Sequence, residues 1–133
     1  MDYLLDTDTC IALIKRKPRR ALDRLLALPV GAVGISSITL AELLYGVAKS
    51  EQKERNRHAL EEFLLPLEIA DFDSKAADAY GIVRAELEKA GKQIGSLDTQ
   101  IGAHAISLGV VLVTHNSREF RRIPNLKMVD WLG

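Results

Sequence analysis

Three acidic side chains in this sequence stand where they could act together on a phosphate group. Asp6 directly follows a short apolar run, Glu42 lies in a helical pattern, and Asp98 opens a later one. Mg²⁺ takes oxygen ligands, usually one or two carboxylates together with waters and phosphate oxygens. Such an ion neutralises a phosphate, lowers the pKa of a bound water and stabilises the departing oxygen. Carboxylates gathered without a metal would instead repel one another and raise their pKa values.

Each acid also has a purely structural interpretation. Asp6 or Asp8 could cap the helix that follows, because Asp is a favoured N-cap residue. The run Thr39-Leu40-Ala41-Glu42 fits a capping box, in which the glutamate returns to the cap. Asp98 would interact favourably with the dipole of the helix that it opens. The sequence leaves both interpretations open at all three positions. Acids on helical faces are expected to be solvated: Glu61, Glu62, Glu86 and Glu88.

The remaining reactive side chains give weaker signals. His104 falls in an amphipathic helix and is expected to be a satisfied histidine of the core or the surface. His58 lies in a charged run and is expected to be exposed, whereas His115 follows an apolar strand and is a further, weaker candidate. The single cysteine, Cys10, is expected to be a small buried apolar residue. No glycine-rich phosphate loop, zinc-ligand spacing or nucleophile elbow is present.

The elements that must position the acids alternate between strands and helices. Apolar runs predict strands at residues 2–6, 33–36, 67–70, 110–113 and 127–129. Helical spacing and chain breakers predict helices at residues 9–15, 19–28, 38–48, 51–65, 74–90 and 99–108, with a short helical turn near residue 118. This alternation predicts a three-layer α/β sandwich, in which a central parallel sheet of four to five short strands is covered by helices on both faces.

The expected topology places the acids at the same edge of the sheet. Right-handed crossovers place the carboxyl ends of the first and fourth strands at the same edge of the sheet. Asp6 follows the first of these strands, and Thr114-His115-Asn116 follow the fourth. Because ligands of open α/β sheets bind outside the carboxyl ends of the strands, we expect the site at this edge.

The length and net charge of the chain limit the classes of protein to which it could belong. At 133 residues the chain has the size of one domain, residues 1–133. A domain of this size can bury a hydrophobic core without disulfides or structural metal ions. The charges of the 18 basic and 18 acidic residues cancel, which argues against a protein whose whole surface attracts polyanions. A neutral total can still hide local patches, and basic residues cluster at 15–20 and 118–122. With no basic leader and no apolar run of bilayer length, we expect a cytoplasmic protein.

Four segments occur in an order and at a spacing that resemble a known family. They are Leu4-Leu5-Asp6-Thr7, Ser36–Leu43 with Gly46, Gly95-Ser96-Leu97-Asp98 and Val113–Phe120. With the closing Arg122-Ile123-Pro124 and Asp130-Trp131, the chain resembles PIN-domain ribonucleases of the VapC type, the toxins of type II toxin–antitoxin pairs. The resemblance covers essentially the whole chain and implies a PIN-like fold.

The resemblance also implies a catalytic set and a cofactor. The implied activity is that of an endoribonuclease that uses Mg²⁺, with Mn²⁺ as a substitute. Asp6 and Asp98 match the metal-binding acids, and Glu42 matches the third acid of the catalytic set. Asn116 matches the fourth position, where PIN domains often carry Asp. Because Asn adds no charge, the number of bound metals stays open, and Glu119 either compensates or serves the helix surface.

The partners implied by the resemblance are a structured RNA and a cognate VapB-like antitoxin. The RNA would be a tRNA anticodon stem-loop or a ribosomal RNA loop, cut to stop translation. The antitoxin would lie across a groove beside the acids of a homodimer or a toxin–antitoxin hetero-oligomer, away from any membrane. The two basic clusters could form an RNA-contacting rim. An aromatic content of 5% argues against base stacking as the main interaction with RNA.

Alternative functions fit part of the pattern. A PIN-like domain that has lost catalysis would act as a binding module. The run Leu4–Thr9 also fits the opening of a haloacid-dehalogenase-type phosphatase, with Asp6 as nucleophile and Asp8 as acid, although Thr114-His115-Asn116 replaces that family's late acidic pair. A phospho-receiver module could use Asp71 as acceptor but lacks the lysine that should follow Val113.

Overall fold

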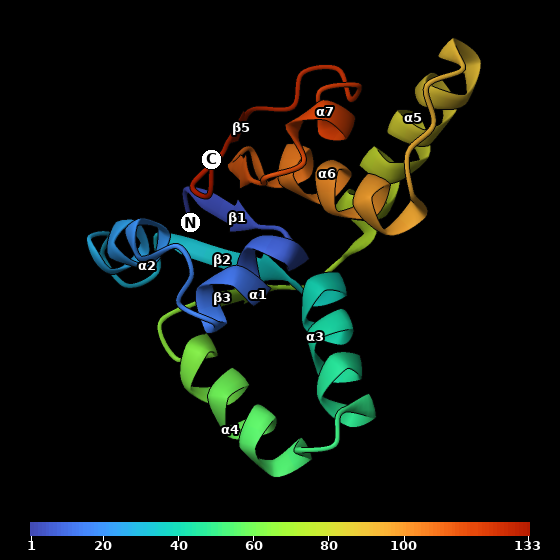
Figure 1. Cartoon of the computed structure of the whole chain (residues 1–133). Coiled ribbons are helices and arrows are strands. Elements are labelled where there is room, and N and C mark those ends of the chain that lie inside the picture. Colours follow the sequence, from blue (N-terminus) through green and yellow to red (C-terminus); the bar gives the residue numbers. More distant parts are fainter.

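Five parallel strands form the centre of the computed structural model, which describes residues 1–133 (Figure 1). The strands are β1 (Tyr3–Leu5), β2 (Val33–Ser36), β3 (Glu68–Ala70), β4 (Val111–Val113) and β5 (Met128–Val129). Their order across the sheet is β3-β2-β1-β4-β5, and every neighbouring pair is parallel. The strand that Asp6 follows, β1, is therefore the central one.

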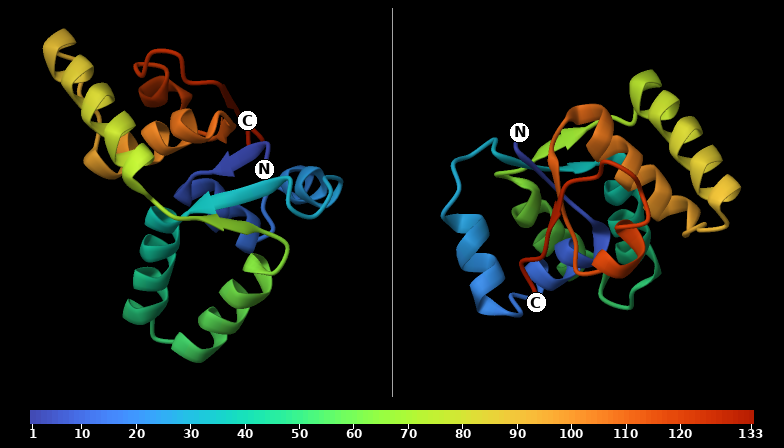
Figure 2. Two further views of the ribbon diagram at one scale, coloured as in Figure 1. Left: turned by 180° about the vertical axis from the view of Figure 1, so that it is seen from behind. Right: turned by 90° about the horizontal axis from the view of Figure 1, so that it is seen from above.

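Seven helices surround this sheet. They are α1 (Thr7–Ile14), α2 (Arg19–Leu26), α3 (Ser37–Lys49), α4 (Lys53–Leu64), α5 (Ser74–Ala90), α6 (Ser96–Leu108) and α7 (Ser117–Phe120). Figure 2 shows α3 and α4 extending to one side of the sheet and α5 to the other. No helix in the structure combines the length and the apolar character needed to cross a membrane.

Two hydrophobic clusters fill the space between the sheet and the helices. Successive side chains of a strand point to opposite faces, so Leu4 and Leu5 enter different clusters. Leu5 and Val113 pack with buried side chains of α1 to α4, whereas Leu4 and Leu112 pack with those of α5, α6 and α7. Burial on both faces explains why the central strands are continuous apolar runs.

The close approach of α6 to the segment after α7 depends on Gly102. A Cβ atom at this position would lie 2.6 Å from Ile123 Cδ1 and 3.6 Å from the Phe120 ring. Ile123 and Phe120 are both buried, so a larger residue at position 102 would displace core side chains. The absence of a side chain at Gly102 therefore lets α6 and α7 pack closely beside the edge where β4 ends.

The predicted fold class is confirmed, and the sheet has five strands. Several of the helix boundaries predicted from the sequence were wrong. The first helix begins at Thr7 instead of residue 9, because Asp6 already serves as its N-cap. The sixth begins at Ser96 instead of residue 99, so the segment predicted as a loop is its first turn and Asp98 lies inside the helix. The second ends at Leu26, two residues before the predicted end.

Candidate active site

Asp6 stands at the junction of β1 and α1, where it is 4% exposed. Its Oδ1 accepts a hydrogen bond from the Thr9 backbone N–H at 2.9 Å, which caps α1. Its own N–H donates to the Val113 carbonyl at 3.0 Å and ties the end of β1 to β4. Burial raises the pKa of Asp6, although hydrogen bonds from Thr114 and Thr9 oppose this rise. Asp6 thus caps a helix and also presents a carboxyl group at the sheet edge where ligands bind.

Glu42 reaches the same region from α3. Its Oε1 accepts a hydrogen bond from Thr7 Oγ1 at 2.8 Å, and Thr39 Oγ1 lies 3.2 Å from that same threonine oxygen. The capping-box interpretation of Glu42 was wrong, because Ser36 is the N-cap of α3 and accepts from the Ile38 N–H. Glu42 lies in the second turn, where its half-buried side chain is directed to α1.

Asp98 completes the set from the first turn of α6. Its pKa is raised to about 6, first by burial and then by the negative charges of Asp6, Glu119, Asp8 and Glu42. Charges influence a pKa in this way only when they are near, so these four carboxyl groups lie in the neighbourhood of Asp98. The structure thus brings together Asp6, Glu42 and Asp98, the three acids singled out from the sequence. It adds Glu119, whose role the sequence left open, and Asp8.

Asn116 lies between β4 and α7, at the carboxyl end of the strand beside β1. Its backbone N–H donates to Thr114 Oγ1 at 2.9 Å, which holds the turn that leads into α7. Its side chain is half-buried. Glu119 follows within α7 and raises the pKa of Asp98. The segment after β4 therefore places Glu119 near Asp98 and holds Asn116 at the carboxyl end of the strand beside β1.

These oxygen donors are of the kind that Mg²⁺ prefers. No group of three or more His, Cys, Asp or Glu side chains is arranged to hold a metal ion by itself. Mg²⁺ commonly keeps several waters and uses only one or two carboxylates, so a complete protein cage is not required. A cation would also offset the repulsion that raises the pKa of Asp98. The residues therefore fit a hydrated divalent cation and do not fit a closed cage of protein ligands.

Comparison with known proteins identifies the family of this chain. The family model of the PIN domain matches residues 3–126. The tRNA(fMet)-specific endonuclease VapC of Salmonella typhimurium is 46% identical over 131 residues, which cover 98% of each chain. The chain belongs to the VapC group of the PIN-domain family. This membership agrees with the resemblance seen in the four sequence segments and rejects the phosphatase and receiver alternatives.

Solved structures of VapC-type proteins share the whole fold. DNA-bound VapBC from Salmonella typhimurium matches with a TM-score of 0.93 and 45% identity, covering 98% of both chains. VapBC2 from Rickettsia felis, bound to a promoter DNA fragment, matches with a TM-score of 0.91 and 44% identity, covering 98% of this chain and 99% of that one. The five-stranded sheet and its helices therefore constitute a VapC-type PIN fold.

In this VapC-type chain each histidine has a partner other than Asp6, Glu42 or Asp98. His104 is buried, as expected, and its Nδ1 lies 2.9 Å from Ser36 Oγ. His58 is exposed, as expected. His115 has a partner that the sequence did not reveal, since its Nδ1 lies 2.9 Å from Asp130 Oδ2. This pair depends on the adjacency of β4 and β5, because 15 residues separate the two side chains.

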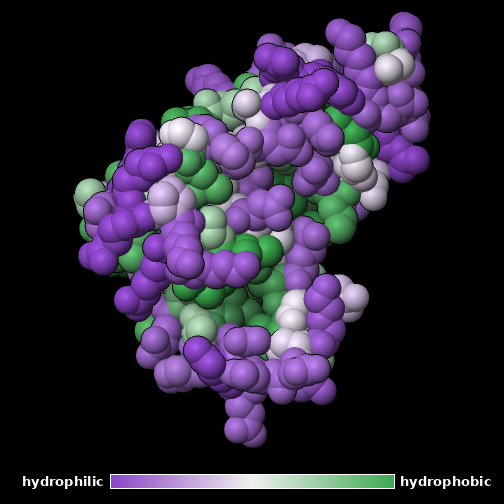
Figure 3. Space-filling view, viewed as in Figure 1, coloured by the Kyte–Doolittle hydropathy of each residue, from purple (hydrophilic) through white to green (hydrophobic).

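An apolar groove adjoins the acids of this PIN domain. It has a volume of about 320 Å³ and lies between α1, α3 and α4. Figure 3 shows apolar side chains within a hollow on this face of the molecule. The apolar lining consists of Ile11, Ile14, Leu43, Val47, Ala59 and Leu60. Glu42 and Lys15 also line the groove, so the acid that contacts Thr7 belongs to both features.

Proposed function

We propose that this VapC-type protein is a metal-dependent endoribonuclease toxin that cleaves a structured RNA and is neutralised by a cognate antitoxin. The observation that carries the proposal is a group of carboxylates at the carboxyl edge of β1 and β4, where burial and then the neighbouring negative charges raise the pKa of Asp98 to about 6. Relatives at 46% and 42% identity are tRNA(fMet)-specific endonucleases, which supports RNA as the substrate. The tRNA anticodon stem-loop is the preferred substrate, and a ribosomal RNA loop is the next.

Each residue of the site has its own proposed role in RNA cleavage. Asp6 and Asp98 would hold Mg²⁺, which when bound would supply Lewis-acid stabilisation of the phosphate and lower the pKa of a water. Glu42, oriented by Thr7, would hold the attacking water and accept its proton. The amide of Asn116 would orient the same water or the phosphate without adding charge. Glu119 supplies a nearby fourth carboxylate.

The antitoxin is proposed to occupy the apolar groove between α1, α3 and α4. Two similar structures are toxin–antitoxin complexes, VapBC and VapBC2, which supports a VapB-like partner for this chain. An apolar segment would bury the groove's aliphatic side chains, and a following basic residue would reach Glu42 at its end. Such an occupant would block access to the acids. We further propose that the toxin forms a homodimer or a toxin–antitoxin hetero-oligomer and acts in the cytoplasm on cellular RNA.

The decisive experiment is the incubation of total bacterial RNA with the purified, antitoxin-free protein. We expect discrete fragments in Mg²⁺, with 5′-phosphate and 3′-hydroxyl ends, and no fragments in EDTA. Asp6→Ala and Asp98→Ala should abolish cleavage while the circular dichroism spectrum stays native. Asp78→Ala, at an exposed position of α5, is the matched control and should cut normally.

Each alternative outcome has a defined meaning. Fragments ending in a 2′,3′-cyclic phosphate would show that the ribose hydroxyl is the nucleophile instead of water. Intact RNA under all conditions would favour a binding module without catalysis. Cleavage retained in Asp6→Ala or Asp98→Ala would remove that residue from the catalytic set.

A further inference from the structure

Four basic side chains line one open pocket that no acidic residue lines. The pocket has a volume of about 580 Å³ and no hydrophobic residue in its lining. Gly91 and four cations form it: Lys92, Arg118, Arg121 and Arg122. All four cations are exposed. In a chain whose formal net charge is zero, this pocket is a local concentration of positive charge.

None of the four cations is neutralised within the molecule. Arginines elsewhere, such as Arg19, Arg57 and Arg84, each pair with a carboxylate four residues further along a helix. The other two ion pairs involve histidines, so no carboxylate lies within 4.0 Å of a pocket nitrogen. Neighbouring like charges disfavour one another unless an anion lies between them. The pocket is therefore suited to a ligand that carries negative charge.

Hydrogen bonds to backbone carbonyls hold the two segments that line the pocket. Helix α5 ends at Ala90, its C-cap Gly91 has a φ of 67° in the left-handed region, and the Lys92 N–H donates to the Leu87 carbonyl at 2.9 Å. Across the pocket, Arg122 Nη1 donates to the Gln93 carbonyl at 3.1 Å. This bond joins the segment after α7 to the loop between α5 and α6. The cations thus come from two segments that are held together without any ligand.

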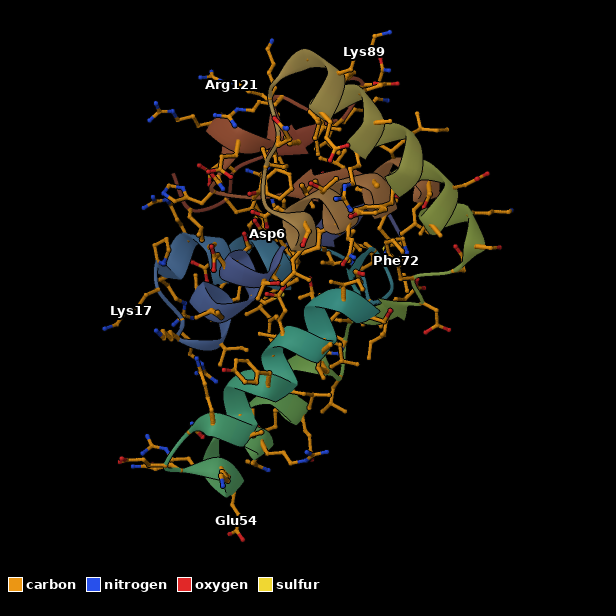
Figure 4. The ribbon with its side chains drawn as sticks, turned by 90° about the vertical axis from the view of Figure 1, so that its right-hand side faces the viewer. Asp6, Lys17, Glu54, Phe72, Lys89 and Arg121 are labelled. Carbon is orange, nitrogen blue, oxygen red and sulfur yellow. The ribbon has the colours of Figure 1, made fainter.

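Both segments also lead to the acids. The loop that carries Lys92 continues into α6, whose first turn holds Asp98. Helix α7 contains Arg118 next to Glu119, and Glu119 acts on the pKa of Asp98. Figure 4 shows Arg121 above Asp6 and Lys17 to its lower left. The pocket is therefore linked to the acids through Glu119, which follows Arg118 in α7 and acts on the pKa of Asp98.

We propose that Lys92, Arg118, Arg121 and Arg122 bind a backbone phosphodiester of the RNA that flanks the scissile phosphate. This inference rests on the proposed ribonuclease function. Guanidinium groups bind phosphate through paired N–H donors, and three of the four cations are arginines. The acids by themselves repel RNA, so a cationic site beside them supplies the attraction that holds the strand in register. The pocket is a positioning site and takes no part in bond cleavage.

The test measures binding of an end-labelled initiator tRNA transcript in EDTA over a series of salt concentrations. The variant Arg118→Gln/Arg121→Gln removes two pocket charges and leaves the Arg122–Gln93 contact in place. The matched control, Lys53→Gln/Arg55→Gln, removes two exposed cations without carboxylate partners at the start of α4. Because all four substitutions are at exposed positions, thermal unfolding should be unchanged in both variants.

We expect the pocket variant to bind about tenfold more weakly, as for the loss of one hydrogen bond to a charged group. The slope of log K against log salt should fall in magnitude by about 1 for one lost phosphate contact. The control should change neither quantity. Arg121→Lys should keep the salt slope while losing affinity, because a lysine keeps the charge but not the paired donors.

Equal losses in the pocket variant and the control, or an unchanged salt slope in the pocket variant, would overturn the proposal. Failure of the wild type to bind the transcript would also overturn it. Cleavage in Mg²⁺ is scored separately on the same RNA. Intact RNA there would overturn the proposed ribonuclease activity, whereas the pocket would still be judged by the binding of the two double variants.

Discussion

The Thr7 hydroxyl donates a hydrogen bond of 2.8 Å to Glu42 Oε1 and so links the first turn of α1 to the second turn of α3. The adjacent Thr39 hydroxyl lies 3.2 Å from the same threonine oxygen. A glutamate side chain has several rotamers, and this contact selects one of them. Glu42 borders both the gathered acids and the apolar groove. Thr7 is therefore a positioning residue for the acid that we assign to the attacking water.

Replacing Thr7 with valine should slow RNA cleavage by about tenfold, the equivalent of one hydrogen bond to a charged group. The loss should fall on kcat, with KM unchanged, because Glu42 acts on water and not on RNA binding. Thr7→Ser keeps the hydroxyl and should restore most of the rate. Single-turnover kinetics with the labelled transcript would check this expectation. A kcat equal to that of the wild type in Thr7→Val would show that Glu42 needs no orientation by Thr7.

Asp98→Asn should stabilise the metal-free protein at pH 8 while abolishing cleavage. The pKa of Asp98 is raised to about 6, so the folded state binds this proton more tightly than the unfolded state does. The stability contributed by the proton is complete below about pH 3.8 and is lost as the pH rises through 6. Asparagine mimics the protonated form, and we expect a gain of about 1–2 kcal/mol after allowance for solvent screening.

Urea unfolding in EDTA at pH 8 and at pH 4 would measure this gain. The difference between Asp98→Asn and the wild type should be present at pH 8 and nearly absent at pH 4. Asp78→Asn, at an exposed position of α5, is the control and should show no such pH dependence. Mg²⁺ should reduce the difference at pH 8 by stabilising the wild type. A destabilised Asp98→Asn at pH 8 would contradict the raised pKa that burial and the neighbouring carboxylates give Asp98.

The sequence predicted the parts of the site that depend on strand topology. Asp6 was predictable because β1 is a continuous apolar run and the residue after it must lie at the carboxyl edge. Its place at the same sheet edge as the segment after β4 follows from the right-handed crossovers that make β1 and β4 neighbours. Helix starts were less certain, because several residues in one segment favour capping. Ser36 and Thr39 both qualify as N-caps of α3, and only the structure selects Ser36.

Contacts between distant side chains could not be predicted. The Thr7–Glu42 hydrogen bond spans 35 residues and depends on how α1 crosses α3. The position of Lys92 beside the arginines in and after α7 depends on the turn at Gly91. Such pairs leave no periodic signal, because each partner by itself looks like an ordinary surface residue. Hydrophobic periodicity fixes which face of an element is buried, but not which polar groups meet at its end.

His104 should make the protein less stable as the pH falls below about 6.5. Burial lowers the pKa of this histidine, although Asp73 and the backbone of Asp71 oppose the change. Because the unfolded state then binds the proton more tightly, stability is present above pH 6.5 and is lost toward the lower folded pKa. His104→Gln should remove this pH dependence. His58→Gln, at an exposed position, should leave it unchanged when unfolding is followed from pH 7.5 to 5.5. An unchanged pH profile in His104→Gln would contradict this role.

Asp130 should hold the C-terminal segment against the core. Its Oδ2 lies 2.9 Å from His115 Nδ1, and its Oδ1 accepts from the backbone N–H groups of Leu132 and Gly133 at 2.8 and 3.0 Å. Burial by itself would raise the pKa of Asp130, but these hydrogen bonds lower it. The adjacent Trp131 is 3% exposed and packs at 5.5 Å from the Tyr3 ring. Loss of the carboxylate should therefore expose the only tryptophan of the chain.

Asp130→Ala should lower the free energy of unfolding by about 1–3 kcal/mol, as expected when hydrogen bonds to a charged group are lost. The emission of Trp131 should shift to longer wavelength in the native state, because the segment that carries it is released. Asp130→Asn keeps an acceptor for the two N–H groups and should show a smaller shift. His115→Ala tests the remaining contact and should act in the same direction with a smaller effect. Native emission unchanged in Asp130→Ala would show that packing of Trp131 alone holds the segment in place.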